Sequence, residues 1–282
     1  MLGKCMVALI TPFTSRNTVD VEGLKALVIR LLQDGVDGFV VCGTTSEVCT
    51  LSNDERELIV DTVIDTVNGK CPIWVGCGTN CTIKSMEYMK MVEDKKIDGI
   101  MLVVPYYNRP SQEGMYQHFY YLATHTKHPI MLYNVPKRTG VNLENETMKR
   151  LVSACSNIVA IKQASSDFSI CELLKDSDVK VFCGDDGLLK ECLDSGGYGI
   201  ISVLGHLEIA LIKKIVDDYN QGKNVDGLDH LLKKKCDIAF IESNPCGIKY
   251  LLNKKGWIDG RVRLPLSEVS YLSKKVLDAY FD

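Results

Sequence analysis

The residue in this sequence that is best suited to carry out a chemical reaction is a lysine at the end of a short apolar run. Lys162 follows Val159-Ala160-Ile161, and a side chain that points from there into a closed sheet is poorly solvated. Because desolvation disfavours the ammonium ion, its pKa falls below the ordinary value of about 10.4 and the free amine becomes available. A neutral amine condenses with a ketone to a Schiff base, an electron sink for carbanion chemistry. Taken alone, the residue also fits a strand-end lysine that reaches solvent.

Hydroxyl side chains follow other apolar runs and could transfer protons. Tyr133 ends one such run, and Thr44, Thr45 and Tyr107 follow two earlier ones. A phenol can shuttle protons when other hydroxyls hold it in a hydrogen-bonded chain. Gly43 and its two threonines also offer N–H and hydroxyl groups suited to a carboxylate. Taken singly, Tyr133 also fits a tyrosine whose ring is packed in the core and whose hydroxyl is exposed to solvent.

One arginine stands in a loop that is rigid enough to bind a carboxylate. Arg138 lies between Pro136 and Gly140, and its planar guanidinium can hold a carboxylate through two hydrogen bonds. A surface arginine is the alternative. Asp185-Asp186 has no third acid or histidine evidently paired with it, so we expect no metal site.

Composition excludes several classes of protein. The chain has 282 residues, 46% of them apolar and 24% charged, so a core of this size needs neither disulfides nor metals. A formal net charge of −3 argues against a nucleic-acid or membrane surface, and no run of about 18 apolar residues indicates a membrane span. Twelve cysteines without a C-x-x-C pair are typical of reduced, buried thiols. We therefore expect a cytoplasmic protein.

Eight short apolar runs could position these side chains. They span residues 6–10, 38–42, 73–77, 99–104, 129–133, 158–162, 179–183 and 199–203. Each run is nearly continuous rather than alternating, which is typical of parallel strands covered on both faces. Helical patterns fill the gaps, and one begins with the capping-box sequence Ser52-Asn-Asp-Glu55.

This alternation predicts a single (β/α)8 TIM barrel over residues 1–221, with additional C-terminal helices over residues 222–282. Active sites of such barrels lie at the C-terminal ends of the strands. The lysine, tyrosines, threonines and arginine described above all stand at or just after the ends of predicted strands, so we expect one active site there.

Five motifs in this order resemble the pyruvate-dependent class I aldolase family, which includes N-acetylneuraminate lyase, and most closely its dihydrodipicolinate synthase branch. The motifs are Gly43-Thr-Thr-Ser-Glu47, Tyr133-Asn-Val-Pro-Lys-Arg-Thr-Gly140, Lys162, Gly184-Asp-Asp186 and Gly196-Gly-Tyr-Gly-Ile-Ile-Ser202. The resemblance extends from Ala8-Leu-Ile-Thr-Pro-Phe13 to Arg263-Leu-Pro-Leu266.

The resemblance implies catalytic roles for four residues. Lys162 is expected to form the Schiff base with pyruvate, so that no separate cofactor is needed. Tyr133 is expected to act as the acid and base, linked through Thr44 to Tyr107, which reaches in from a partner subunit. The same resemblance implies a homotetramer built as a dimer of dimers.

It also implies substrate-binding roles. Thr45 is expected to hold the pyruvate carboxylate, Arg138 the carboxylate of L-aspartate-4-semialdehyde, and Ile201 and Gly184 to line the site. The expected activity is that of a carbon–oxygen lyase that makes 4-hydroxy-tetrahydrodipicolinate for lysine and diaminopimelate biosynthesis. Two alternatives remain: a sister aldolase for a sugar acid, such as N-acetylneuraminate or a 2-keto-3-deoxy sugar acid, or an inert barrel with a regulatory role. Arg138 favours the first activity, because the sister enzymes usually lack it.

Two positions depart from the family pattern. Ser46 stands where the family usually has glycine, which could stiffen the turn that places Thr45. Lysine-inhibited members hold the effector amino groups with an acid on the helix after Asn80, and here that position is Lys84, although Asn80 and Tyr106 match. Because like charges repel, we predict weak or absent inhibition by lysine.

Overall fold

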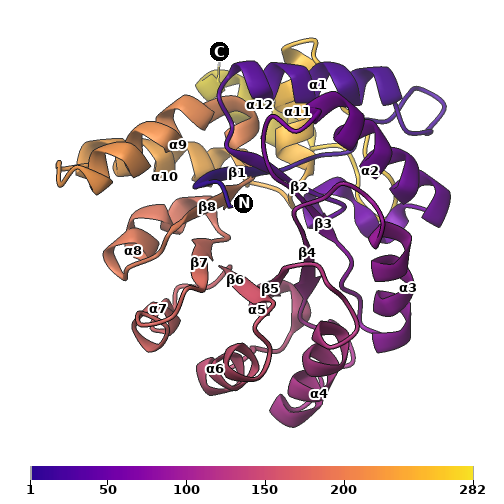
Figure 1. The fold of residues 1–282 in the computed structure, drawn as a ribbon. Helices are drawn as coiled ribbons and strands as arrows, with labels where there is room; N and C mark the ends of the chain where they lie inside the picture. The colour runs from indigo at the N-terminus through magenta and orange to yellow at the C-terminus, as the bar shows by residue number, and fades with distance from the viewer. Residues whose placement is uncertain (1, 282) are drawn as a thin grey trace. The chain divides into compact units, whose positions relative to one another are not determined.

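The computed structural model describes residues 2–281 (Figure 1). Eight strands follow one another in chain order round a closed barrel, and helices occupy the connections between them. The predicted fold class, a (β/α)8 barrel with additional C-terminal helices, is confirmed. Met1, the first residue of the predicted range 1–221, and Asp282, the last residue of the predicted range 222–282, lie outside the described residues. The boundary between these two ranges stays a prediction.

The chain forms two compact units, Ile73–Ile201 and Leu2–Pro72 with residues 202–281. The first unit contains a run of parallel strands: β3 (Ile73–Gly76), β4 (Gly99–Val103), β5 (Ile130–Asn134), β6 (Ile158–Gln163), β7 (Lys180–Cys183) and the start of β8 (Gly199–Ser202). Its helices are α3 (Thr82–Val92), α4 (Gln112–Ala123), α5 (Pro136–Thr139), α6 (Asn145–Ala154), α7 (Ile170–Leu173) and α8 (Leu189–Asp194). Helices α4 and α6 pack against each other (Figure 1).

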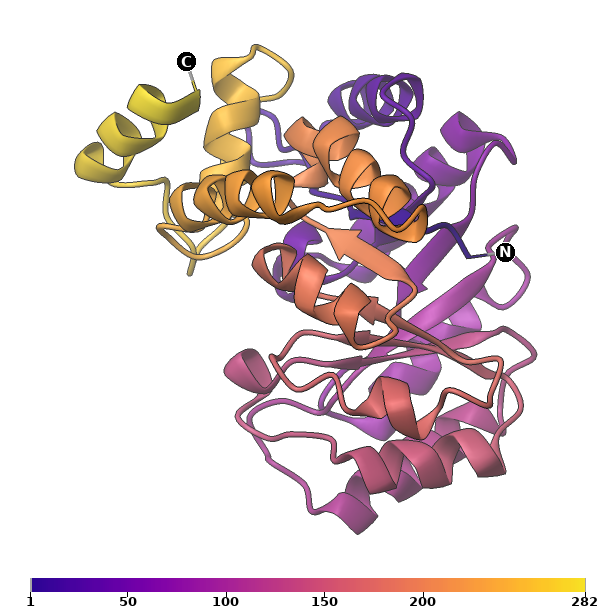
Figure 2. The same ribbon diagram turned by 90° about the vertical axis from the view of Figure 1, so that its left-hand side faces the viewer.

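The second unit begins with β1 (Cys5–Ala8) and β2 (Gly38–Val41), which pair in parallel. Its helices are α1 (Val21–Gln33), α2 (Asn53–Val67), α9 (Gly205–Asn220), α10 (Asp226–Ala239), α11 (Cys246–Lys254) and α12 (Tyr271–Phe281). Figure 2 shows the last three, orange to yellow, gathered together, with α12 in contact with both α10 and α11. These are the predicted C-terminal helices.

Local chemistry explains where α2 begins. Ser52 accepts a hydrogen bond from the Glu55 backbone N–H (3.2 Å), and the Glu55 carboxylate accepts one from the Ser52 N–H (3.0 Å). This reciprocal arrangement satisfies two backbone donors that a helix leaves unpaired at its start. The predicted capping box is therefore confirmed.

The barrel strands are buried along nearly all of their length, as their continuous apolar sequences predict. All twelve cysteines are free thiols and nine of them are buried, where they pack as small apolar side chains. None of the helices in residues 2–281 combines the length and apolarity that crossing a bilayer requires.

Candidate active site

Lys162 and Tyr133 lie directly opposite each other on adjacent strands. The register of β5 and β6 pairs Tyr133 with Lys162, and the Lys162 Nζ lies 4.4 Å from the centre of the Tyr133 ring. Both side chains are only 5% exposed. The predicted nucleophile and the predicted proton-transfer group are therefore brought together, because each ends an apolar strand at the same level.

Burial favours the neutral amine form of Lys162. Desolvation lowers the pKa of Lys162 from 10.5 to about 8, assisted by the positive charge of Arg138 and opposed by the negative charge of Asp186. Near pH 8 a substantial fraction of the amine is neutral, which nucleophilic attack on a carbonyl requires. Asp186 is itself 2% exposed, and its influence on the lysine was not foreseen from the sequence.

Gly184 leaves room for the lysine side chain. A Cβ at this position would lie 3.0 Å from Lys162 Cγ and 3.1 Å from its Cε. Such distances are tight contacts, so a larger residue would push against the lysine. The structure thus places Gly184 beside the amine-bearing side chain, consistent with its predicted place in the site.

Two amides fix the ends of the strands that carry the pair. Asn134 lies opposite Gln163 in the same register, and Asn134 Nδ2 donates to Gln163 Oε1 (3.1 Å) and to Asn142 Oδ1 (2.8 Å). Gln163 Nε2 donates in turn to the Asp167 backbone oxygen (2.8 Å). Both amides are buried, and a satisfied buried network holds its members in one arrangement. Sequence reasoning missed Gln163, although it adjoins Lys162.

Arg138 lies on a short helix whose ends are set by its neighbours. Proline stands at the first position of α5, and Gly140 ends the helix in the left-handed conformation, with φ +73°. The arginine side chain is exposed, yet its charge acts on Lys162. A guanidinium so placed can bind an incoming carboxylate.

The other predicted residues of this unit differ in their surroundings. Ile201 is fully buried in β8. Tyr107 is 90% exposed and adopts a left-handed backbone, with φ +74°. Within a single chain it is therefore not packed beside the buried Tyr133.

Thr44 and Thr45 belong to the second unit, in a single turn of 3-10 helix after β2. Thr45 is buried, and its Oγ1 accepts a hydrogen bond from Asn244 Nδ2 (2.9 Å). The backbone of Ser46 lies outside the left-handed region, so this position does not need glycine. Its hydroxyl donates to the Leu9 backbone oxygen (2.6 Å), and the serine is accommodated without strain.

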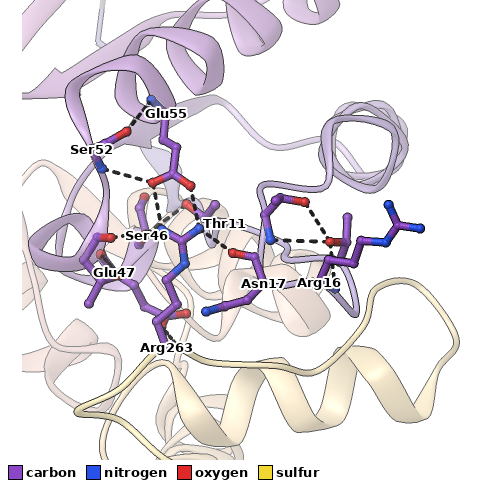
Figure 3. Close-up of polar contacts among 11 residues, drawn as sticks. Thr11, Arg16, Asn17, Ser46, Glu47, Ser52, Glu55 and Arg263 are labelled. Atoms are coloured by element: carbon purple, nitrogen blue, oxygen red, sulfur yellow. Dashed lines mark hydrogen bonds and ion pairs between the residues drawn. The ribbon is translucent and has the colours of Figure 1, made fainter.

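Glu47 anchors the end of this turn. Its Oε1 accepts from Lys249 Nζ (2.5 Å) and its Oε2 from the Arg263 backbone N–H (2.8 Å). Burial lowers the pKa of Lys249, and the Glu47 carboxylate opposes that shift. Figure 3 shows the Arg263 guanidinium beside this turn, where it also binds both carboxylate oxygens of Glu55. Asn244 and Lys249 were missed in the sequence because they lie about 200 residues from the turn.

Comparison with known proteins decides the family. Residues 1–281 match the Dihydrodipicolinate synthetase family. The chain belongs to this family. The resemblance seen in the five sequence motifs is thereby confirmed, and with it the assignment of the chain to a family of lyases.

Individual members of the dihydrodipicolinate synthetase family are similar to this chain in sequence and in structure over nearly its whole length. The 4-hydroxy-tetrahydrodipicolinate synthase 1 of Halalkalibacterium halodurans is 39% identical over 282 residues, which cover 98% of this chain and 95% of that protein. The solved structure of a monomeric dihydrodipicolinate synthase variant superposes with a TM-score of 0.96 at 35% identity, covering 99% of this chain and 95% of that one. A dihydrodipicolinate synthase from Bacillus anthracis gives a TM-score of 0.95 at 35% identity, with 100% and 98% covered.

Proposed function

We propose that the chain condenses pyruvate with L-aspartate-4-semialdehyde through a Schiff base on Lys162. The activity is the synthesis of 4-hydroxy-tetrahydrodipicolinate, on the route to lysine and diaminopimelate, in keeping with its relatives. The observation that carries the mechanism is the buried amine of Lys162, with its pKa lowered to about 8, next to the Tyr133 ring.

The reaction balances without an oxidant or a separate cofactor. The Lys162 amine and the pyruvate ketone form a C=N bond and release water. Loss of a methyl proton gives an enamine, whose carbon attacks the aldehyde carbon of the second substrate; the aldehyde oxygen gains a proton and becomes the hydroxyl. The amino group of that substrate then replaces the lysine on the imine carbon, which closes the ring and restores the amine. The Schiff base supplies the electron sink.

The remaining residues take the roles that the family resemblance implies. Tyr133 removes and returns protons, with Thr44 and the partner subunit's Tyr107 completing its hydroxyl chain. Thr45 holds the pyruvate carboxylate, and Arg138 holds the carboxylate of the second substrate. These assignments are supported by the motifs in which the residues stand.

We also propose that Ile201 and Gly184 line the substrate site, and that the enzyme works in the cytoplasm as a homotetramer. Gly184 is supported by the space it leaves beside Lys162. The tetramer rests on the family resemblance, and contact between chains is supported by Tyr107, whose exposed side chain is available to a neighbouring chain.

Borohydride trapping tests the proposal. We expect incubation with pyruvate followed by borohydride to add the mass of a reduced pyruvate adduct at Lys162, and the Lys162→Arg variant to acquire none. Turnover with L-aspartate-4-semialdehyde should greatly exceed turnover with N-acetylmannosamine. Absence of an adduct at Lys162 would refute the mechanism, and preference for the sugar aldehyde would assign the chain to the sister aldolases.

A further inference from the structure

The turn that bears Thr44 and Thr45 is tied at two places to the C-terminal part of the same unit. Asn244, which lies just before α11, donates to the Thr45 hydroxyl (2.9 Å). Lys249, inside α11, donates to the Glu47 carboxylate (2.5 Å). Two anchors from one helix region therefore hold the turn on either side of Ser46.

The Glu47–Lys249 ion pair is completely buried, since both side chains have 0% exposure. Taking two charges out of water is costly, so such a pair is weak evidence for extra stability, and geometric specificity is its better attested use. The Lys249 Nζ also lies 4.2 Å from the centre of the Phe13 ring, which offers a cation a second favourable contact. The ammonium group is thus confined to one position, and so is the carboxylate that it binds.

Glu47 also has a backbone conformation that needs support. Its φ of +55° and ψ of +37° lie in the left-handed region, which is uncommon for a residue other than glycine. The Arg263 N–H holds its second carboxylate oxygen (2.8 Å), and the Thr50 N–H holds its backbone oxygen (2.9 Å). The glutamate is therefore fixed at both its side chain and its main chain.

We infer that Asn244 and Lys249 are positioning residues for the Thr45 hydroxyl. This inference rests on the proposed function, in which Thr45 holds the pyruvate carboxylate. Lys249 acts through Glu47, two residues after Thr45, by fixing the backbone of the turn. Asn244 acts on the hydroxyl itself.

The direction of the hydrogen bond from Asn244 to Thr45 determines which partner the Thr45 hydroxyl can still bind. A hydroxyl has one proton to donate and can accept through its oxygen lone pairs. Because the Thr45 oxygen accepts from the Asn244 amide, its own proton stays available for an acceptor such as a carboxylate. Hydrogen bonds in a chain polarise one another, so the amide also makes the hydroxyl a stronger donor.

The Asn244→Asp variant tests this polarity at nearly constant shape. A carboxylate at position 244 accepts the Thr45 proton and turns it away from the substrate. We expect the pyruvate concentration that gives half-maximal trapping on Lys162 to rise about tenfold, with the KM for L-aspartate-4-semialdehyde unchanged. Thr45→Val should raise the half-maximal pyruvate concentration by a similar factor. The effects of the two substitutions should not add in the double variant, because both remove the same hydrogen bond from the Thr45 hydroxyl to pyruvate.

The paired substitution Glu47→Gln with Lys249→Met tests the buried ion pair without leaving a lone buried charge. We expect about a hundredfold loss in kcat/KM for pyruvate, the scale typical of a small misplacement of a binding group. Lys254→Met is the matched control, because it makes the same substitution on the same helix and removes an ion pair to Asp278 (2.8 Å) that does not touch the turn. The control should keep the wild-type response to pyruvate.

The outcomes separate this inference from the proposed function. No adduct on wild-type Lys162 refutes the proposed function. Suppose that the wild type forms the adduct and that the Asn244→Asp and paired variants depend on pyruvate as the wild type does. This result overturns the positioning role and leaves the proposed function intact. Equal losses toward both substrates, accompanied by lower thermal stability, also overturn it, since a purely structural defect has that signature. If the paired variant does not fold, the Asn244→Asp arm decides.

Discussion

At the scale of single residues, the proposed chemistry depends on the protonation state of Lys162. Burial lowers its pKa to about 8, so the neutral amine increases as the pH rises through 8 and is nearly complete a unit or more above it. We expect the rate of Schiff-base formation at low pyruvate to rise with pH to a plateau, with an apparent pKa near 8. Rapid-quench borohydride trapping from pH 6 to 10 measures it, and a rate that shows no plateau and still rises steeply at pH 10, as for a lysine with the ordinary pKa of 10.5, contradicts it.

Asp186 sets part of that value. Its negative charge raises the pKa of Lys162 against the effect of burial, so Asp186→Asn should shift the trapping profile to lower pH. Asp185→Asn is the matched control, because the neighbouring acid instead pairs with Lys137 (3.5 Å) near the surface. A profile that moves equally in both variants would remove the specific role of Asp186.

The Arg138→Ala substitution should affect the condensation step but not the formation of the pyruvate adduct. Arg138 is proposed to bind only the second substrate, so Arg138→Ala should still form the pyruvate adduct but lose most of the condensation with L-aspartate-4-semialdehyde. Loss of its positive charge also allows the pKa of Lys162 to rise, so trapping must be measured above pH 9. Condensation at the wild-type rate would show that Arg138 does not hold the second carboxylate.

At the scale of helices and strands, the start of α2 connects stability with the site. Ser52 and Glu55 satisfy each other's backbone donors, and the same Glu55 carboxylate binds Arg263. Ser52→Ala should lower the free energy of unfolding by about 1 kcal/mol, the usual cost of losing an N-cap. Urea denaturation gives the value, and Ser52→Asp, which preserves a capping oxygen, should recover most of the loss.

The elements themselves were largely predictable from the sequence. The apolar run 158–162 corresponds to β6, Ile158–Gln163, because a strand covered on both faces excludes polar residues along its length. Lys162 and Tyr133 were recognisable because polar groups at the ends of such runs are exceptions to that pattern. Their pairing followed from the barrel, in which neighbouring strands end at one level.

Contacts between distant segments were not predictable. Asn244 and Thr45 are 199 residues apart, and Glu47 and Lys249 are 202 apart. No periodic pattern relates such positions, since the contacts depend on how α11 packs rather than on its own sequence. The buried Lys249 reads in the sequence as an ordinary helical lysine.

At the scale of the whole molecule, Tyr107 makes assembly testable. Its side chain is exposed and its backbone is left-handed, a conformation uncommon for a residue other than glycine, which fits a residue held out to complete a neighbouring chain's site. We expect a four-chain species in analytical ultracentrifugation, and Tyr107→Phe to slow turnover without changing that species. Fully active monomers would contradict the proposed assembly, and a monomeric variant is known among similar structures.

The response to lysine is a second property of the whole enzyme. Lys84 is exposed on α3, at a position where the family resemblance implies an acid in lysine-inhibited members, and we expect its positive charge to repel a lysine effector. We expect little inhibition in steady-state assays and increased inhibition in Lys84→Glu. Half-inhibition of the wild type by sub-millimolar lysine would contradict this prediction.

The long separation between Glu47 and Lys249 also determines when the turn of Thr45 can be anchored during synthesis of the chain. The two residues are 202 positions apart, so at about 5–20 residues per second the ribosome adds Lys249 roughly 10–40 s after Glu47. Lys162 is added in between, before the residues that anchor the turn of Thr45. Chains that stop before Asn244 therefore contain Lys162 but lack both residues that anchor the turn of Thr45, so the turn is held in place only after this part of the chain has been made.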